Sequence, residues 1–243
     1  MNQVQELSDS IIGVYEGDVV DNIREGTGTS FASTPLKNSI SCFLGKLSFP
    51  QTGDYYDGEF RGGYRAGFGK YVCNHGKRVY EGEWQQSRRH GQGKETWMGK
   101  SPGLVCCAYE GKFQKDLFHG RGILRKMGTR YEGDFTLGSK NGEGRMDYPD
   151  GSYYEGRWDN NRCHGRGKYT KNTGEEYEGD WINGQRYGQG VNTDVKGVIF
   201  DGEWQNNVKH GSGSITYPTG KTRTGVWKNG NWASWTTEDF TKK

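Results

Sequence analysis

The sequence predicts an all-β protein, an elongated single-layer antiparallel sheet made of about nine tandem β-hairpins. Three observations lead to this prediction. A Tyr-acid-Gly triplet returns through most of the 243 residues, a Gly-x-Gly motif follows each full copy at one fixed distance, and residues typical of tight turns lie between the two. Self-similarity at a short fixed period is typical of repeat proteins, in which each unit packs only against its neighbours.

The first residue of each triplet defines position 0 of a repeat. From Tyr109 onward these positions lie 22 or 23 residues apart. The intervals that follow Tyr15 and Tyr80 are longer, at 41 and 29 residues, so we expect insertions near residues 31–53 and 101–107. Position 0 is occupied by Tyr15, Tyr56, Tyr80, Tyr109, Tyr131, Tyr154, Tyr177 and Phe200, and a degenerate ninth copy ends in Gly225-Val226-Trp227.

Each repeat carries further landmarks at fixed positions. Gly-x-Gly always begins at position 11, and position 4 is Trp or Phe in every copy except the first, where it is Val19. Positions 6 and 7 often hold Asn or Gly, which tolerate the positive φ of a two-residue hairpin turn. A Gly at position 20 marks the turn into the next repeat. The turn pairs are Asp21-Asn22, Gly62-Gly63, Asn160-Asn161, Asn183-Gly184, Asn206-Asn207 and Asn229-Gly230.

The landmarks also predict the two faces of the sheet. A two-residue turn pairs position 0 with position 13 and position 2 with position 11, and a four-residue loop would shift this pairing by two without changing the faces. Because side chains alternate along a strand, one face collects the Tyr and Trp/Phe rings together with bare glycines. The acids at position 1 lie on the opposite, solvated face. We expect each ring to rest on the glycine backbone of its hairpin partner.

The composition fits such a core of rings. Aromatic residues make up 14% of the chain, and the net charge of +3 is too small for the self-repulsion of a typical disordered protein. The five cysteines are odd in number and form no C-x-x-C pair, residues 1–10 do not resemble a secretion signal, and no apolar run reaches the length of a membrane span. We therefore expect a cytoplasmic protein with free thiols.

With these landmarks the chain resembles the MORN (membrane occupation and recognition nexus) repeat family. The clearest copies are Tyr154-Glu155-Gly156-Arg157-Trp158 with His164-Gly165-Arg166-Gly167, and Tyr80-Glu81-Gly82-Glu83-Trp84 with His90-Gly91-Gln92-Gly93. The resemblance implies a twisted single-layer sheet of hairpins, found in stand-alone scaffolds and in accessory modules. The first copy lacks the aromatic residue and the last lacks both Tyr and Gly-x-Gly, as terminal repeats often do.

The repeat also sets the expected domain organisation. Residues 1–13 form an N-terminal segment, residues 14–231 form the repeat array, and residues 232–243 form a C-terminal tail. The tail contains Trp232, Trp235 and Phe240 in a polar stretch, so we expect it to fold back as a cap on the last hairpin.

Residues that usually carry chemistry belong here to the repeat itself. His90, His119, His164 and His210 all stand directly before Gly-x-Gly, and copies of one position lie too far apart to share a metal ion. Each Gly-x-Gly falls within a predicted strand, which is the wrong context for a phosphate-binding loop. Cys106-Cys107 has no basic neighbours that would activate a thiol. We predict no enzyme activity, catalytic residue, metal, cofactor, small-molecule substrate or nucleic-acid partner.

Two sets of residues are candidates for binding partners. Position 9 is basic in six repeats, and stacked hairpins would align these cations along one edge, where they either lie on neighbouring rings or bind an anionic partner. The ring face either covers itself or leaves a groove for a helix or strand of another protein, and the two roles are compatible. The cations are Arg24, Arg65, Arg89, Lys140, Arg186 and Lys209, and the rings are Tyr80, Trp84, Tyr154, Trp158, Tyr177, Trp181 and Trp204.

The expected function is that of a non-enzymatic scaffold. This short chain, made almost wholly of the repeat, is similar to stand-alone family members of the axoneme such as those of the radial-spoke head. The resemblance thus implies a subunit of a cilium, flagellum or other cytoskeletal assembly, with proteins of that assembly as partners. The alternative is a membrane-recruitment module that binds anionic phospholipids such as phosphoinositides through the basic residues.

Overall fold

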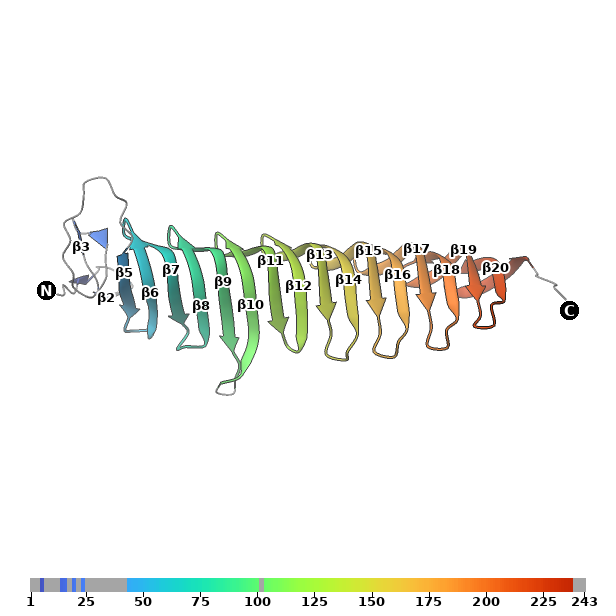
Figure 1. Ribbon diagram of the computed structural model, residues 1–243, viewed down its shortest axis with the longest axis horizontal. Helices are drawn as coiled ribbons and strands as arrows, with labels where there is room; N and C mark the ends of the chain where they lie inside the picture. The colour runs from blue at the N-terminus through green and yellow to red at the C-terminus, as the bar shows by residue number, and fades with distance from the viewer. Residues whose placement is uncertain are drawn as a thin grey trace. The chain divides into compact units, whose positions relative to one another are not determined.

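The structure, a computed structural model, describes residues 5–6, 14–16, 19–20, 23–24, 43–100 and 103–237. Every regular element in these residues is a β-strand, and the pairing between strands is antiparallel (Figure 1). None of the described residues therefore forms a helix that could cross a membrane. The chain divides into two compact units, Met1–Met127 and Gly128–Lys243, here called unit 1 and unit 2. The predicted all-β fold of tandem hairpins is confirmed.

Unit 1 contains one sheet and one small separate hairpin. β3 pairs with β4, and the other strands follow the order β1, β2, β5, β6, β7, β8, β9, β10, β11, each antiparallel to the next. The strands are β1 (Gln5–Glu6), β2 (Val14–Glu16), β3 (Val19–Val20), β4 (Ile23–Arg24), β5 (Phe43–Phe49), β6 (Asp54–Arg61), β7 (Tyr64–Cys73), β8 (Arg78–Gln85), β9 (Arg88–Met98), β10 (Val105–Gln114) and β11 (Leu117–Lys126).

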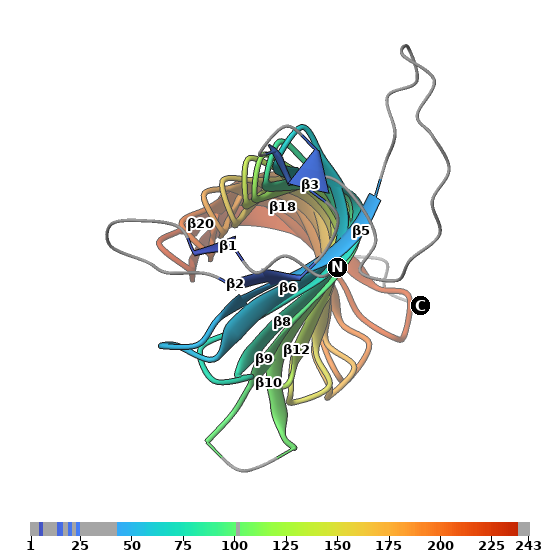
Figure 2. The same cartoon turned by 90° about the vertical axis from the view of Figure 1, so that its left-hand side faces the viewer.

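Unit 2 is a sheet in which strand order follows the sequence, and each strand is antiparallel to the next. Seen end on, successive hairpins within a unit lie one behind another (Figure 2). The strands are β12 (Thr129–Thr136), β13 (Ser139–Asp147), β14 (Tyr153–Asp159), β15 (Arg162–Thr170), β16 (Glu176–Ile182), β17 (Gln185–Thr193), β18 (Ile199–Gln205), β19 (Val208–Thr216), β20 (Thr222–Lys228) and β21 (Asn231–Thr237).

The two-residue turns at positions 6 and 7 are confirmed wherever the structure describes them. In the β14–β15 turn, Asn160 and Asn161 have φ of 46° and 68°, and Gly62 and Gly63 have φ of 57° and 78°. Positive φ at both central residues defines the turn type that matches strand twist. Asp21 and Asn22 lie outside the described residues.

The predicted pairing is shifted by two residues in the seven hairpins from β6–β7 to β18–β19. Tyr56 pairs with Tyr71 at position 15, not with position 13, and Gly58 pairs with Gly69 at position 13. The cause is a β-bulge between Gly58 and Phe60. It adds two residues to the second strand and places Gly67, with φ of 52°, in the left-handed region. A shift of two leaves the faces unchanged, so the predicted faces stand.

The first hairpin differs from the predicted one. Strand β5 pairs with β2 and with β6, and Gly45 lies opposite Gly58, as the position-13 glycine of a repeat does. Residues 43–49 are therefore not part of an inserted loop, and the additional residues lie between β2 and β5. In the third repeat, the extra residues lengthen β9 and β10 around their connecting loop.

The C-terminal segment extends the array by one strand. Residues 231–237 form β21, the second strand of the ninth hairpin, with Trp227 opposite Trp232 and Gly225 opposite Trp235. The ring of Trp235 lies against Gly225 and packs edge-on against Trp227 at 6.0 Å. Residues 232–237 are thus part of the last hairpin and not of a separate tail. Phe240 lies outside the described residues, and a cap formed by the end of the chain stays a prediction.

Candidate functional site on the aromatic face

Each position-0 tyrosine packs on the glycines of its own hairpin. Tyr154 is only 1% exposed. A Cβ added to Gly167 would collide with the Tyr154 ring, and a Cβ added to Gly156 would collide with the Cα of Gly167. The Tyr154 hydroxyl donates a hydrogen bond to the carbonyl oxygen of Arg157 at 2.9 Å, inside the bulge. Glycine is therefore required at position 13 by the space that the ring occupies, and at position 2 by the close approach of the facing backbone.

The rings form a continuous ladder within each unit. Tyr154 meets Trp158 of its own repeat and Trp181 of the next, both edge-on at 5.2 Å between centroids. Such edge-to-face pairs are stabilising beyond the area they bury. The ladder comprises Tyr56, Phe60, Tyr80, Trp84, Tyr109 and Phe113 in unit 1, and Tyr131, Phe135, Tyr154, Trp158, Tyr177, Trp181, Phe200, Trp204 and Trp227 in unit 2.

The basic residues at position 9 cover this ladder. Arg186 pairs with Trp181 across its hairpin, and its guanidinium carbon lies 4.4 Å from the Trp204 ring centroid and 5.4 Å from that of Tyr177. Burial lowers the pKa of Arg186, and likewise those of Arg65 and Lys209. Arg65, Arg89, Lys140 and Lys209 lie over the rings of their own repeats in the same way.

The structure therefore places five of the six predicted cations on the ring face and not along an outer edge. The structure does not describe the side chain of Arg24. Binding of an anion by these residues stays a prediction, and such an anion would have to approach across the aromatic face. The seven rings predicted to meet a partner are at most 7% exposed, so most of their surface is covered by the protein itself.

A groove nevertheless opens over part of the aromatic face of unit 2. It has a volume of about 630 Å³, and Tyr154, Tyr177 and Trp181 form its floor. Its walls include Tyr148, Pro149 and Tyr169 from the strand ends and turns between repeats. Tyr148 and Tyr169 pack edge-on at 6.4 Å and remain partly exposed. The groove thus presents apolar ring surface.

The groove walls also carry charges. Lys171 and Glu175 form an ion pair at 2.5 Å, and Arg186 also belongs to the lining. Burial raises the pKa of the Tyr148 phenol to about 12 and that of the Cys163 thiol to about 12, so both groups are neutral. Sequence reasoning found Arg186 and the floor, but it missed Tyr148 and Tyr169 because positions 15 and 17 vary between repeats.

Unit 1 has a charged cluster on the same face. Glu95 occupies position 15, is 2% exposed, and receives Arg78 Nε and Arg89 Nη1 at 2.5 Å each. Arg89 also contacts Asp116 at 3.2 Å in the turn of the following hairpin. A buried carboxylate is tolerated only when it is paired in this manner. The cluster ties neighbouring hairpins together. The sequence signal for it was the acid at position 15, which departs from the repeat.

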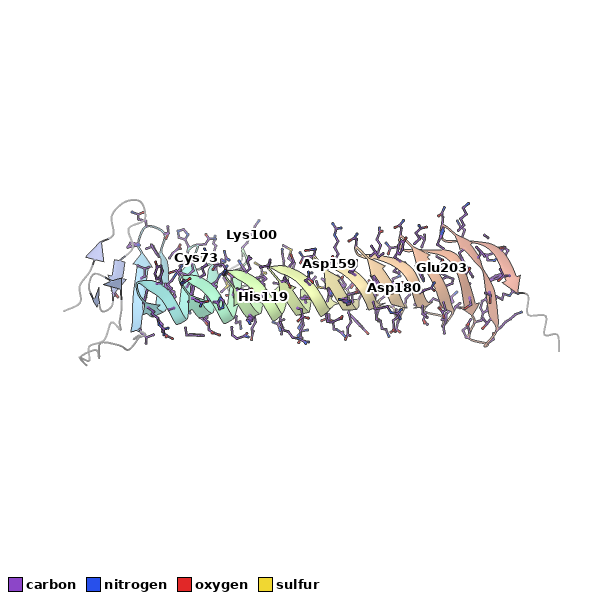
Figure 3. The ribbon with its side chains drawn as sticks, turned by 90° about the horizontal axis from the view of Figure 1, so that it is seen from above. Cys73, Lys100, His119, Asp159, Asp180 and Glu203 are labelled. Carbon is purple, nitrogen blue, oxygen red and sulfur yellow. The ribbon has the colours of Figure 1, made fainter. Side chains whose placement is uncertain are left out.

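The four histidines that precede Gly-x-Gly follow the repeat, and the described cysteines are free thiols. His90, His119 (Figure 3), His164 and His210 recur at position 10, next to the bulge of their hairpins. In the part of the chain that the structure describes, no group of His, Cys, Asp and Glu is arranged to hold a metal ion. Burial raises the pKa of the Cys73 and Cys107 thiols, which disfavours the reactive thiolate.

The fold and the aromatic face together define a repeat scaffold of stacked hairpins. The family model of the MORN repeat matches residues 15–32, 56–78, 80–99, 109–130, 131–153, 154–176, 177–197 and 200–222. The chain therefore belongs to the MORN repeat family. It is also similar to MORN repeat-containing protein 3 of Xenopus laevis, with 34% identity over 70 residues. That alignment spans 29% of this chain and 29% of the relative.

Proposed function

We propose that this chain is a non-enzymatic structural scaffold that binds other proteins, as a subunit of an axonemal (radial-spoke-type) or other cytoskeletal assembly. The observation that favours protein binding is the groove over unit 2, where Tyr148, Pro149 and Tyr169 leave apolar surface open to a partner. Rings that are partly exposed and rigidly held are the usual anchors of protein interfaces. The axonemal part of the proposal is an analogy with stand-alone proteins of the family.

The experiment is cross-linking and affinity purification of the tagged chain from ciliated cells, with the partners identified by mass spectrometry. We expect axonemal or cytoskeletal proteins, and their recovery should fall in Tyr169→Asn, which removes a groove ring. Asn is the natural residue at the same position of the next repeat, Asn192, so this variant should fold. Tyr187→His, at position 10 where four other repeats have His, is the matched control.

Unchanged recovery of partners in Tyr169→Asn would exclude the groove as their binding site. Recovery of no cytoskeletal protein by the unmodified chain would exclude the proposed assembly. In both cases the purified variant is first compared with the unmodified chain by thermal unfolding, so that loss of fold is not mistaken for loss of binding.

The rival function is recruitment to anionic membranes through the position-9 cations. These cations already lie over the rings, with the Arg89 side chain only 15% exposed, which does not favour a headgroup contact. Flotation of the unmodified chain with phosphoinositide-containing vesicles tests the rival directly. Substituting Arg65 or Arg186 by Glu would also disrupt the ring ladder, so the comparison that matters is between vesicles with and without the anionic lipid.

A further inference from the structure

The bulge of most hairpins is closed by a carboxylate of the same chain. In these hairpins position 3 is Asp or Glu, and its side chain accepts a hydrogen bond from the backbone amide of position 12, directly after the left-handed glycine. The pairs are Glu59 with Phe68 at 2.8 Å, Glu83 with Gln92 at 2.6 Å, Asp134 with Glu143 at 3.2 Å, Asp180 with Gln189 at 3.1 Å, and Glu203 with Ser212 at 3.0 Å. Asp180 and Glu203 are labelled in Figure 3.

The bulge explains why this amide needs an acceptor. Within the β8–β9 hairpin, Gly82 pairs with Gly93 and Trp84 pairs with Arg89, so Gln92 between them has no partner across the hairpin. A backbone amide outside the ladder needs another acceptor. Amides that follow a left-handed residue form a concave donor site that suits an anion, and the Glu83 carboxylate fills it here.

Two hairpins keep the bulge but reverse the charge. In β10–β11, position 3 is Lys112 and position 12 is Arg121, and in β14–β15 they are Arg157 and Arg166. The left-handed glycines that precede the arginines, Gly120 and Gly165, have φ of 57° and 61°, close to the 56° of Gly91 in a closed bulge. The donor geometry is therefore retained while the internal carboxylate is replaced by a cation.

The second of these bulges is partly neutralised by its neighbours. Arg157 lies 3.6 Å from Glu143, and Arg166 lies 3.7 Å from Asp180. The first bulge is different. Among the described residues, neither Lys112 nor Arg121 forms an ion pair, and both side chains are exposed. Arg121 also has no partner across its hairpin, because Gly111 pairs with Gly122 and Phe113 with Phe118.

We propose that the β10–β11 bulge binds a carboxylate of an acidic peptide, with the Arg121 backbone amide, the Arg121 side chain and Lys112 as its ligands. A carboxylate is favoured over other anions because five hairpins of the same chain hold a carboxylate on the same amide. In those hairpins the carboxylate belongs to the chain itself, whereas at this bulge the two cations would hold a partner's carboxylate by charge attraction. The site deepens the proposed scaffold function, on which it rests, by naming the chemistry of one partner.

The test is a titration of the ¹⁵N-labelled full chain, followed by amide chemical shifts, with hexaglutamate, with inorganic phosphate and with phosphatidylserine vesicles. We expect hexaglutamate to shift the Arg121 amide selectively, whereas the Phe68 and Gln92 amides, which are already bonded, stay in place. Lys112→Glu gives the bulge its own carboxylate, as in five other repeats, so it should fold. It should weaken hexaglutamate binding about tenfold or more, the size expected for loss of a charge-assisted hydrogen bond.

The matched control is Lys115→Glu, which makes the same charge change in the turn of the same hairpin, outside the bulge. It should leave the Arg121 response within about twofold, since a single exposed charge contributes little. Equal losses in Lys112→Glu and Lys115→Glu would reduce the effect to net charge and overturn the proposal. A stronger response of the Arg121 amide to inorganic phosphate or to the vesicles than to hexaglutamate would overturn the carboxylate assignment.

Failure of the site and failure of the scaffold function are distinguishable. If the unmodified chain recovers cytoskeletal partners from cells while hexaglutamate leaves the Arg121 amide unshifted, the carboxylate site is wrong and the scaffold proposal stands. If hexaglutamate binds but no cytoskeletal partner is recovered, the site stands and the proposed assembly is wrong.

Discussion

The indole Nε1 of Trp84 donates a hydrogen bond of 3.0 Å to the carbonyl oxygen of Gly69, which belongs to the preceding repeat. The same bond joins Trp158 to Gly144, Trp181 to Gly167 and Trp204 to Gly190. The position-13 glycine thus acts twice, because its bare Cα receives the tyrosine ring of its own repeat and its carbonyl holds the tryptophan of the next. Cohesion between hairpins therefore depends on Trp at position 4, where Phe can supply only packing.

Replacing Trp84 by Phe should cost about 1 kcal/mol of unfolding free energy, the net value of one hydrogen bond. Phe113 occupies the same position of the next repeat, so the ring itself fits. Trp84→Ala removes the ring as well and should cost about 3 to 5 kcal/mol. Urea unfolding followed by circular dichroism measures both. Trp232→Phe, at a side chain that is 51% exposed, is the control and should be nearly neutral. A Trp84→Phe variant as stable as the unmodified chain would contradict the assigned role of the hydrogen bond.

Replacing Gly167 by Ala should be among the most damaging single changes in unit 2. The added Cβ would overlap the Tyr154 ring, and the ring has no room to move because Trp158 and Trp181 pack against it. We expect a loss of about 3 kcal/mol or more, in the range of severe overpacking. Gly174→Ala is the control. It lies in open space with φ of 89°, so it should cost only about 1 kcal/mol of backbone strain.

Thermal and urea unfolding of both glycine variants would check this difference. A Gly167→Ala variant as stable as Gly174→Ala would mean that the Tyr154 ring does not rest on the glycine, which is the packing on which the repeat depends.

Much of this fold could be predicted from single residues. Asn160-Asn161 and Gly62-Gly63 specify two-residue turns because few other residues accept positive φ twice in succession. Alternation along the strands then places Tyr154 and Trp158 on one face and Glu155 on the other. These predictions depend on local conformation alone, and the structure confirms them.

The remaining features depend on partners that are distant in the sequence. The bulge at Gly67 changes the pairing without changing the repeat length, so no spacing reveals it. Strand β5 takes the place expected for residues near Gly26 because Gly45 supplies the bare backbone that Gly58 needs. The acid at position 3, such as Glu83, suggested no role from sequence, because its partner is the Gln92 amide, which only the structure shows to lie outside the ladder.

Replacing Arg186 by Ala should cost about 1 to 2 kcal/mol, from the lost contact with the Trp204 and Tyr177 rings and the hydrogen bond from Nη2 to the Asn207 carbonyl at 2.9 Å. Arg186→Lys should cost less, because other repeats carry Lys at this position. The control is Arg166→Ala, whose side chain is 70% exposed. Urea unfolding of the three variants tests the order, and a loss in Arg166→Ala equal to that in Arg186→Ala would contradict it.

Alkaline pH should destabilise the protein through its buried tyrosines. Burial raises the pKa of Tyr148 to about 12 and raises those of Tyr80, Tyr109, Tyr154 and Tyr177 further. The unfolded chain loses these protons near pH 10, before the folded chain does. Their contribution to stability is therefore complete below pH 10 and is lost as pH rises toward the folded pKa values. The slope is about 1.4 kcal/mol per pH unit for each tyrosine.

A single substitution isolates this effect from other groups that titrate in the same range, such as Lys209, whose lowered pKa acts in the opposite direction. Tyr177→Phe matches the natural Phe200 of the next repeat and removes one phenol. Between pH 10 and 11 its free energy of unfolding in urea should fall less steeply than that of the unmodified chain, by about 1 kcal/mol per pH unit. Equal slopes would show that Tyr177 ionises as readily in the folded chain as in the unfolded one, and that its ring is not sealed against the glycines as the structure has it.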